Sequence, residues 1–330
     1  MGVGTAIQRH WDRVDAITVL LMPLSLLYGL VVRARAIAYR IGVFKIRQWN
    51  VPVLVVGNLT VGGSGKTPLV IKLAQALQAR GWRPGVVSRG YGGRVRAATV
   101  VTSGSDPATV GDEPVLIARM AQVPVVVARK RPDAVDRLLA DSKVDLVLSD
   151  DGLQHWALGR NAEIALIDET LDRGNGFLLP AGPLRESRSR LSRVDLRVRR
   201  DAAPGPGEHA MYTTASVARN LLTGEEVSLS SFVGLSLIAV AGIHRPERFF
   251  TMLHEADLKA QEMAFPDHHA FVREDLSQDP GQTILMTWKD AVKCESFAQP
   301  RWWAVCQEVT ISEQLVTEVE QLLRASSDGS

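Results

Sequence analysis

The chain has 330 residues, of which 46% are hydrophobic and 6% aromatic, and its basic and acidic residues leave a formal charge of +2. This length supports two domains with separate cores, and the weak charge without a basic, aromatic-rich stripe excludes nucleic acid as a partner. The two cysteines, Cys294 and Cys306, form no metal-binding or disulfide pattern and are typical of a reducing compartment.

The first predicted element is an apolar segment near the N-terminus. Residues 17–32 carry no charged side chain. Five basic residues follow them: Arg33, Arg35, Arg40, Lys45 and Arg47. The segment is slightly shorter than the about 20 residues that span a bilayer, and no small-residue cleavage site follows. A spanning helix, a helix at the membrane interface and a helix packed on the protein's own core are the alternatives. We assign residues 1–47 to a membrane-associated helical arm.

A glycine-dense turn follows residues 51–56, which have the composition of a buried parallel strand. Backbone N–H groups in such a turn can surround a phosphate, and the next helix offers the positive end of its dipole. A general P-loop begins with glycine where this chain has Thr60, but Pro68 suits the first turn of the following helix. The sequence therefore predicts a nucleotide-phosphate site formed by Thr60, Val61, Gly62, Gly63, Ser64, Gly65, Lys66 and Thr67.

Strand-like and helical stretches alternate after this loop. The predicted strands of the first half cover residues 51–56, 85–88, 123–128, 144–149 and 164–167. Such alternation builds a mainly parallel sheet with helices on both faces. Residues 201–208 are rich in proline and glycine and indicate a connection, and a second α/β pattern begins near residue 235. We expect a P-loop core at 48–200, a linker at 201–230 and a smaller α/β lobe at 231–330 that closes the site.

Two adjacent aspartates, Asp150 and Asp151, follow the predicted strand 144–149. A carboxylate at the end of a strand can bind Mg²⁺ beside phosphates, and the Thr67 hydroxyl is placed to do the same. We therefore predict a magnesium site here, with an Asp-Asp-Gly turn as the structural alternative. The pattern does not rank Asp150 against Asp151. His155 is predicted to orient a phosphate or a carboxylate, or else to be structural.

Two further polar clusters lie at 111–114 and 267–269. By spacing alone, Asp112 or Glu113 is favoured as the cap of the helix that follows. Asp267, His268 and His269 lie together in a predicted loop. Because no Cys/His pattern supplies further zinc ligands, a histidine that orients a carboxylate base is the better interpretation of this cluster.

Arginines are concentrated between residues 173 and 200. They are Arg173, Arg185, Arg188, Arg190, Arg193, Arg197, Arg199 and Arg200. Guanidinium groups suit phosphates and anionic headgroups, but for most of these residues a solvated basic face is favoured. Arg185, inside the proline-rich segment 179–186, is the one we expect to bind an anion. The glycine-rich segment 88–93 is predicted either to approach a ligand with its backbone or to form a tight turn.

In combination, these motifs resemble the tetraacyldisaccharide 4′-kinases, the lipid A 4′-kinases of Gram-negative bacteria. The resemblance covers most of the chain and rests on the joint order of segments 57–68, 88–93, 111–114, 149–155, 180–186 and 267–268. It implies two α/β lobes joined by a short β linker, with ATP and Mg²⁺ as cofactors. It also implies phosphorylation of tetraacyldisaccharide 1-phosphate to lipid IVA at the cytoplasmic face of the inner membrane. No obligate protein partner is inferred.

The resemblance also implies roles for individual residues. Asp112 is expected to accept the proton of the substrate hydroxyl, with His268 as its partner. Glu113 is expected to be a catalytic or magnesium-binding carboxylate. The remaining assignments are Lys66 to catalysis, Thr67, Asp150 and Asp151 to Mg²⁺, and His155 and Arg185 to the substrate.

Three other functions are alternatives: a P-loop kinase with a different alcohol as acceptor, a nucleotide-driven switch that binds membrane partners, and a binding protein with a vestigial phosphate loop. The segment Thr287-Trp-Lys-Asp290 resembles a guanine-reading motif only superficially. The intact Lys66–Thr67 pair argues against a vestigial loop.

An interfacial arm suits a lipid substrate, because extraction of one long acyl chain into water costs on the order of 10 kcal/mol.

Overall fold

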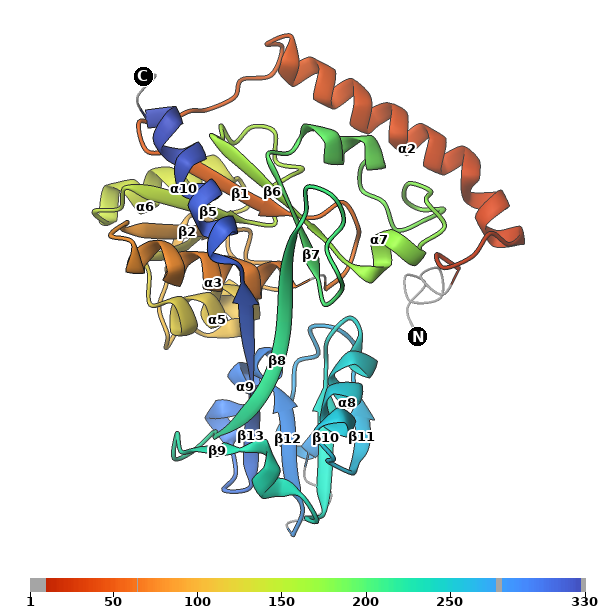
Figure 1. Cartoon of the computed structure of the whole chain (residues 1–330), viewed down its shortest axis with the longest axis vertical. Helices are drawn as coiled ribbons and strands as arrows, with labels where there is room; N and C mark the ends of the chain where they lie inside the picture. Colours follow the sequence, from red (N-terminus) through yellow and green to blue (C-terminus); the bar gives the residue numbers. More distant parts are fainter. Residues whose placement is uncertain (1–9, 64, 277–280, 328–330) are drawn as a thin grey trace.

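The structure is a computed structural model that describes residues 10–63, 65–276 and 281–327 of the chain. Ser64, one of the predicted phosphate-loop residues, lies outside the described residues. The molecule has a larger first lobe, which contains the glycine-dense turn, and a smaller second lobe below it in Figure 1. A long N-terminal helix, α2 (Ala16–Arg40), lies across the first lobe on the side away from the second.

The first lobe is built around short strands. They are β1 (Val53–Gly57), β2 (Pro84–Ser88), β3 (Thr99–Val101), β4 (Val125–Val127), β5 (Leu146–Asp150), β6 (Ala162–Ile167) and β7 (Leu196–Arg200). Strands β1, β2, β4, β5 and β6 are completely buried, and β3 and β7 only partly. Its helices are α3 (Lys66–Ala79), α4 (Pro107–Val110), α5 (Asp112–Ala121), α6 (Arg131–Asp141), α7 (Glu169–Arg173) and the 3-10 turn η1 (Arg188–Arg193).

The second lobe repeats the α/β alternation on a smaller scale. Its strands are β9 (Glu226–Ser228), β10 (Leu237–Ala241), β11 (Ala260–Ala264) and β12 (Thr283–Thr287). Its helices are α8 (Pro246–Glu255) and α9 (Trp288–Cys294), with 3-10 turns η2 (Leu229–Phe232), η3 (Arg273–Leu276) and η4 (Glu295–Phe297).

Both lobes share one mainly parallel sheet with the strand order β11-β10-β12-β13-β8-β7-β6-β1-β5-β2-β4-β3, and β9 pairs with β8. Strand β1 is buried on both faces: Leu54 and Val56 contribute to one apolar core, and Val53 and Val55 to the other. Its register pairs Val56 with Asp150 at the end of β5. The loops that follow β1 and β5 therefore emerge side by side, which brings the predicted phosphate and metal sites together.

Two long antiparallel strands connect the lobes. They are β8 (His209–Asn220) and β13 (Trp302–Ile311), which run between the two lobes in Figure 1. Residues 201–208, expected to connect the lobes, lead into β8, so the linker is a strand pair rather than an irregular segment. A two-stranded connection carries the chain out to the second lobe and back again.

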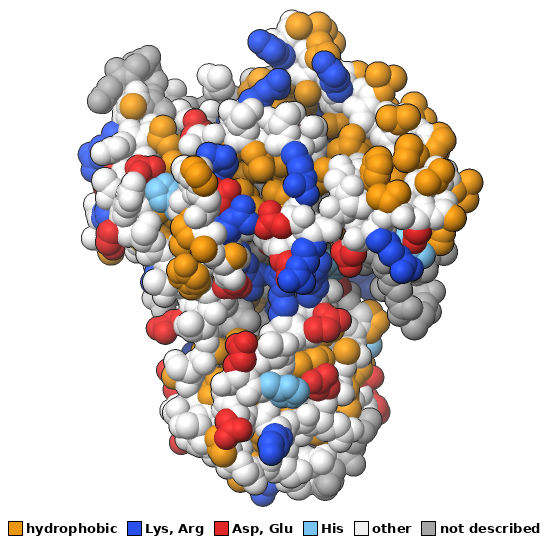
Figure 2. Space-filling view, turned by 45° about the vertical axis from the view of Figure 1, so that its right-hand side comes forward, with side chains coloured by type: hydrophobic (Ala, Val, Ile, Leu, Met, Phe, Trp, Pro, Cys, Tyr) orange, Lys and Arg blue, Asp and Glu red, His pale blue; other side chains and the backbone are white. Residues whose placement is uncertain are grey.

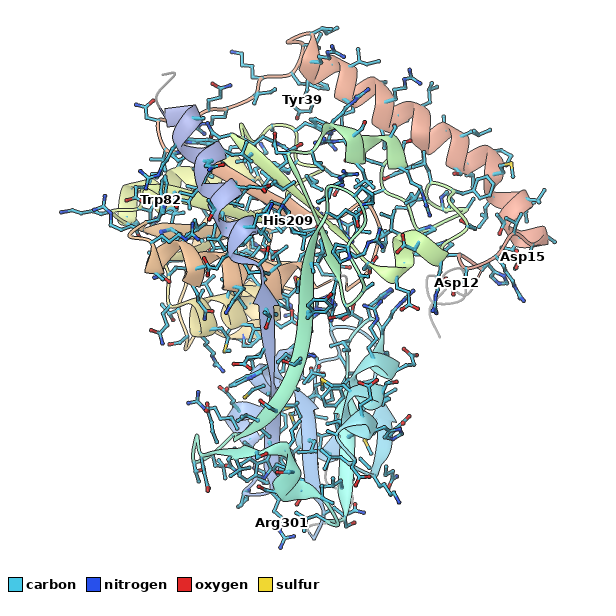
Figure 3. The ribbon with its side chains drawn as sticks, viewed as in Figure 1. Asp12, Asp15, Tyr39, Trp82, His209 and Arg301 are labelled. Atoms are coloured by element: carbon cyan, nitrogen blue, oxygen red, sulfur yellow. The ribbon has the colours of Figure 1, made fainter. Side chains whose placement is uncertain are left out.

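The C-terminal helix α10 (Glu313–Ser327) returns to the first lobe. Its apolar residues Leu315 and Val319 belong to the same core as Leu73 of α3. His209 on β8 also faces this helix, and its Nε2 lies 3.1 Å from Oε2 of Glu318 (Figure 3). The expected second lobe, 231–330, therefore differs from the structure at its C-terminal end, because β13 leads the chain back before α10 begins.

Helix α2 is longer than the predicted apolar segment 17–32 and continues through Pro23 to Arg40. It is held on one side by hydrogen bonds from Ser25 Oγ to the carbonyl of Leu178 (2.7 Å) and from Tyr28 Oη to the carbonyl of Arg185 (3.1 Å). Its other side is apolar and exposed, and only 11% of the most apolar stretch of 18 residues in this helix is buried. The helix is therefore not part of the protein's own core. Its length and composition would also allow it to cross a membrane.

Candidate active site

A cavity of about 1940 Å³ lies between the two lobes. Small-molecule pockets commonly measure about 300–1000 Å³, so this one has room for a nucleotide and a second substrate together. Basic side chains gather in the groove where the lobes meet, as Figure 2 shows. Lys66, Thr67, Asp150, Asp151, His155, Arg185 and His268 line this cavity, and Asp112 contacts His268 at its edge.

The phosphate loop occupies the turn between β1 and α3. Gly65 is the N-cap of α3 and has a φ of 92°, a left-handed conformation that favours glycine. Lys66 Nζ donates to Asn58 Oδ1 (3.0 Å), and the Asn58 amide donates to Oγ1 of the buried Thr60 (2.9 Å). Thr60, the departure from a general P-loop, thus supports the asparagine that contacts the lysine.

Two residues outside the predicted site lie against this loop. A Cβ atom on Gly62 would meet His244 Nε2 at 2.3 Å, and one on Gly65 would meet Arg200 Nη1 at 2.7 Å. His244 comes from the loop between β10 and α8, so the second lobe reaches the phosphate loop directly. Arg200 is mostly buried and ion-paired with Asp201 at 2.8 Å, so the expectation of a solvated face is wrong for this arginine.

The two aspartates after β5 have different surroundings. Asp150 is 1% exposed, its Oδ2 lies 3.4 Å from Thr67 Oγ1, and its Oδ1 has no hydrogen-bond partner among the described residues. Both oxygens of Asp151 accept from Arg185 Nη1 at 2.8 Å, and Lys66 Nζ lies 3.6 Å away. Arg131 also supports the turn, because its Nη2 donates to the carbonyls of Asp150 (2.9 Å) and Asp151 (3.0 Å).

These surroundings shift the pKa values of the two carboxyl groups in opposite directions. Burial, together with the charges of Glu113 and Asp151, raises the pKa of Asp150. Burial alone would raise the pKa of Asp151 too, but Lys66 and Arg185 outweigh it and hold that pKa well below its usual range. Asp151 is therefore already neutralised by protein cations, whereas Asp150 has no comparable partner.

The donor set at Asp150 fits Mg²⁺. Within the described residues, no group of three or more His, Cys, Asp or Glu side chains forms a metal cage. Magnesium rarely uses such a cage and commonly takes one or two protein oxygens with phosphates and water. The unpartnered Oδ1 of the buried Asp150 and the Thr67 hydroxyl, which lies 3.4 Å from the other carboxylate oxygen, supply two such oxygens.

His155 lines the same cavity as Asp150 and Asp151. The backbone N–H of Arg131 donates to its Nε2 at 3.3 Å, so the other ring nitrogen is the one that carries a proton. Burial and the nearby Arg131 and Arg160 lower the pKa of His155 from 6.5 to about 4. The imidazole is therefore neutral at physiological pH and can donate one hydrogen bond, but it adds no charge.

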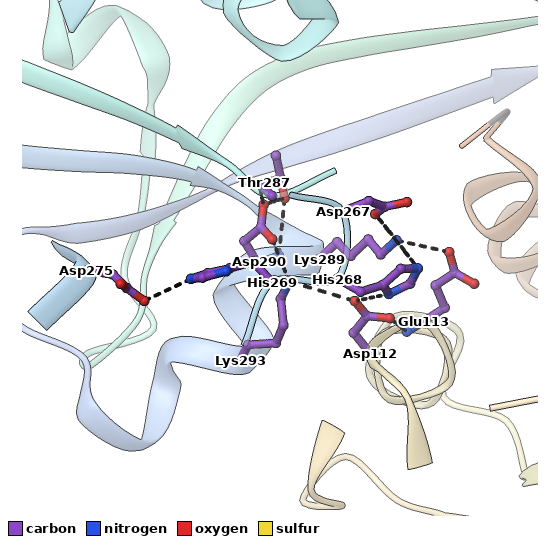
Figure 4. A network of polar contacts seen from close by, with 11 residues as sticks. Asp112, Glu113, Asp267, His268, His269, Asp275, Thr287, Lys289, Asp290 and Lys293 are labelled. Carbon is purple, nitrogen blue, oxygen red and sulfur yellow. Dashed lines mark hydrogen bonds and ion pairs between the residues drawn. The ribbon is translucent and has the colours of Figure 1, made fainter. Parts of the chain in front are cut away.

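Asp112 and His268 meet across the cleft from opposite lobes (Figure 4). Asp112 is the first residue of α5, where its Oδ1 accepts from the Glu113 N–H (2.9 Å), and its Oδ2 lies 3.1 Å from His268 Nδ1. The expected pairing is present, but the expected cap is not: the N-cap of α5 is Gly111, no side chain caps the helix, and Asp112 and Glu113 lie in its first turn. Burial alone would raise the pKa of Asp112, but the hydrogen bond from His268 and the nearby Lys289 bring it below its usual value. Asp112 is therefore an ionised acceptor.

His269, the neighbour of His268, has a different environment. Its Nε2 lies 2.9 Å from Asp275 Oδ2, and its ring packs between Phe265 and Phe271 with centroids 4.8 Å from each. These contacts lie within the second lobe and face away from Asp112. The choice of His268 over His269 thus agrees with the geometry.

Sequence reasoning missed several residues of this site, including Asn58, Arg131, His244 and Lys289. Arg131 precedes a proline at a helix start, and His244 follows a strand, positions that are common to many α/β loops. Signals existed for Asn58, which lies in the motif segment 57–68, and for Lys289, which lies in the segment 287–290 that superficially resembles a guanine-reading motif. Its actual neighbours are Glu113, Asp267 and His268.

The fold and cleft together define a class of protein: a two-lobed P-loop phosphotransferase, with a phosphate loop and paired aspartates on one lobe and an Asp–His pair formed between the lobes. Comparisons with known proteins specify the family. Residues 17–324 match the family model described as tetraacyldisaccharide-1-P 4'-kinase. The chain belongs to the tetraacyldisaccharide 4′-kinase family, and the resemblance predicted from the sequence is confirmed.

Individual relatives support the same assignment. The chain is 47% identical to the tetraacyldisaccharide 4′-kinase of Nitrosococcus oceani over 98% of this chain and 96% of that one. It is 43% identical to the Aeromonas hydrophila enzyme, over 98% and 97% of the two chains. The crystal structure of LpxK from Aquifex aeolicus, determined in complex with ATP, matches with a TM-score of 0.80 and 28% identity over 93% of this chain and 99% of that one. The predicted α/β fold and kinase class are confirmed.

Proposed function

We propose that this chain transfers the γ-phosphate of ATP to the 4′-hydroxyl of tetraacyldisaccharide 1-phosphate, forming lipid IVA. The observation that carries the proposal is the pairing of Asp112 with His268 in the cavity that also contains the phosphate loop and Asp150. Family membership supplies the substrate class, since its relatives are named tetraacyldisaccharide 4′-kinases. ATP as the donor is supported by the LpxK complex from Aquifex aeolicus.

In this reaction Asp112 acts as the base. Its Oδ2 accepts the proton of the 4′-hydroxyl while the hydroxyl oxygen forms a bond to the γ-phosphorus and the bond to the β-phosphate oxygen breaks, which releases ADP. Because phosphoryl transfer has a loose transition state, the proton moves late and the base mainly orients the hydroxyl. A carboxylate with a lowered pKa can perform this role, and His268 holds it in place.

The remaining residues bind and neutralise the phosphates. Lys66 and the N-terminus of α3 hold the β- and γ-phosphates, and Arg185 and the neutral His155 contact the anionic groups of the substrates. Thr67 and Asp150 hold Mg²⁺, which supplies positive charge to the phosphate oxygens when bound. Asp151 supports this site through Lys66 and Arg185.

Helix α2 brings this cleft to the lipid, because its Tyr28 and Arg35 line the cavity. It is fixed lengthwise to the first lobe through Ser25 and Tyr28, and its open face carries Leu20, Leu27 and other apolar side chains. A helix attached to its own domain in this way suits a position along the membrane surface better than a crossing one. The chain then works at the cytoplasmic face of the bacterial inner membrane.

Leu27→Glu is expected to reduce sedimentation with anionic phospholipid vesicles at least about fivefold, because it places a charge on the apolar face. Leu27 is 58% exposed, so the change leaves the core intact. The matched control is Gln78→Glu, which adds the same charge at an exposed position of α3. Equal vesicle binding by the two variants would contradict the membrane role of α2.

The decisive test of the activity compares two lipid acceptors. Wild-type protein in detergent micelles is given Mg-ATP labelled at the γ-phosphate, with either tetraacyldisaccharide 1-phosphate or lipid IVA, whose 4′-position is already phosphorylated. We expect labelled lipid only with the first acceptor. Hydrolysis of ATP without lipid labelling, or equal labelling of both acceptors, would refute the proposed function.

A further inference from the structure

Helix α9 directs two lysines from the second lobe toward the start of α5 in the first (Figure 4). Lys289 Nζ lies 3.3 Å from His268 Nε2, 3.2 Å from Asp267 Oδ1 and 3.3 Å from Glu113 Oε1. Lys293 Nζ lies 2.7 Å from Asp290 Oδ1 and 3.9 Å from Asp112 Oδ2. The proposed base and its histidine thus lie beside two cations from one helix.

The contact between Lys289 and His268 keeps Nε2 of the ring unprotonated. An ammonium group has three donors and no acceptor, so the His268 Nε2 that faces it must accept. In the neutral ring the proton then resides on Nδ1, which faces Asp112 Oδ2 at 3.1 Å. The Asp112 carboxylate only accepts, so it keeps a proton on Nδ1 in any case. Without Lys289, Nε2 would be free to take a second proton, because Asp267 Oδ1 lies 3.8 Å from it.

Lys289 is itself held firmly in the charged form. Its side chain is only 17% exposed, and the carboxylates of Glu113 and Asp267 flank the ammonium group. Burial alone would lower the pKa of Lys289, but these carboxylates and Asp112 raise it above its ordinary value. The contact with Glu113 also crosses from one lobe to the other, so the complete arrangement requires the lobes to be docked as they are in this structure.

We propose that Lys289 is a positioning residue of the transfer reaction: it donates to Nε2 of His268 and so keeps that nitrogen unprotonated while Nδ1–H donates to Asp112. Asp112 then keeps its acceptor oxygens toward the substrate hydroxyl. Lys289 acts through His268 rather than on the reacting atoms. This role in the reaction rests on the proposed function, whereas the tautomer itself does not.

The charge of Lys289 also opposes formation of an imidazolium ion. The groups that face His268 are Asp112 from α5, Lys289 from α9, Asp267 beside it in the chain at 3.8 Å, and the ring of Tyr91 at a centroid distance of 5.0 Å. Two carboxylates favour the charged ring, and Lys289 disfavours it. Removal of this cation therefore raises the pKa of His268.

The first test is nitrogen NMR of the full chain in detergent micelles, with histidine labelled in both ring nitrogens and His268 assigned by its loss in His268→Gln. In the wild type we expect protonation at Nδ1. Lys289→Met removes the donor and the charge, so the pKa of His268 should rise by about one unit and Nε2 should carry a proton in a larger share of molecules at neutral pH. An unchanged His268 signal in Lys289→Met would overturn the inference.

Three further variants separate the effects of the donor, the charge and the fold. Lys289→Gln retains a neutral donor, so it should keep the Nδ1–H tautomer while the pKa of His268 still rises. Lys289→Arg retains both donor and charge and should restore the wild-type signal. Lys259→Met removes an exposed lysine from the same lobe and should change nothing. If Lys289→Met does not fold, an unchanged pKa in Lys289→Gln would overturn the inference instead.

Kinetics connect this tautomer to the reaction. We expect Lys289→Met to lower kcat about tenfold at neutral pH with little change in KM for ATP, and to shift the acid limb of the kcat profile upward by about one pH unit. An unchanged kcat and pH profile would remove Lys289 from the reaction. If the wild type transferred no phosphate to lipid, the proposed function would fail while the NMR result could still stand.

Discussion

Replacement of Asp112 by asparagine is expected to lower kcat for phosphate transfer by about 10²- to 10⁴-fold, the range typical of a lost general base. Asparagine has nearly the same shape as aspartate, and it cannot take the hydroxyl proton. The affinity for ATP should change little, because the phosphate loop and Lys66 lie on a different element from Asp112. The measurements are kcat for lipid phosphorylation and ATP binding by fluorescence titration on the same preparation.

Asp133 provides the matched control for this change. It lies in the first turn of α6, as Asp112 does in α5, but its side chain is exposed. Asp133→Asn should therefore remain close to the wild type in kcat. A kcat for Asp112→Asn within about threefold of the wild type would remove Asp112 from the role of base.

The site could be predicted largely because its residues follow strands in sequence. The phosphate loop follows β1 and Asp150 ends β5, and the parallel pairing of Val56 with Asp150 brings the two together. The continuous apolar run of β1 and the glycines of the turn are both local signals in the sequence. The Asp112–His268 pair required the family resemblance, because the two residues are far apart in the chain and belong to different lobes.

Other features could not be predicted because they depend on tertiary packing. Helix α10 has a regular apolar stripe at Leu315 and Val319, but the stripe does not specify which lobe it packs on. The same limitation applies to Lys289, whose role depends on a contact across the lobe interface. The ranking of Asp150 against Asp151 also required three dimensions, since only the structure reveals that Arg185 and Lys66 neutralise Asp151.

Replacement of Asp150 by asparagine is expected to lower the rate of lipid phosphorylation at saturating Mg-ATP by about 10²- to 10³-fold, because a proposed magnesium ligand is lost. The unpartnered Oδ1 and the neighbouring Thr67 hydroxyl make Asp150 the closer ligand in our assignment. Binding should show the same loss: in Asp150→Asn, Mg²⁺ should no longer tighten the binding of ATP measured by calorimetry.

Asp151→Asn supplies the contrast at the adjacent position. Loss of the Asp151 carboxylate leaves Arg185 and Lys66 without their ion-pair partner, so we expect a lower unfolding temperature and weaker binding of the anionic substrates. The magnesium enhancement of ATP binding should persist in this variant, because Asp150 and Thr67 are retained. If the enhancement were instead lost in Asp151→Asn and kept in Asp150→Asn, Asp151 would be the magnesium ligand and Asp150 would not. The unpartnered oxygen of Asp150 would then belong to a buried, protonated carboxyl group.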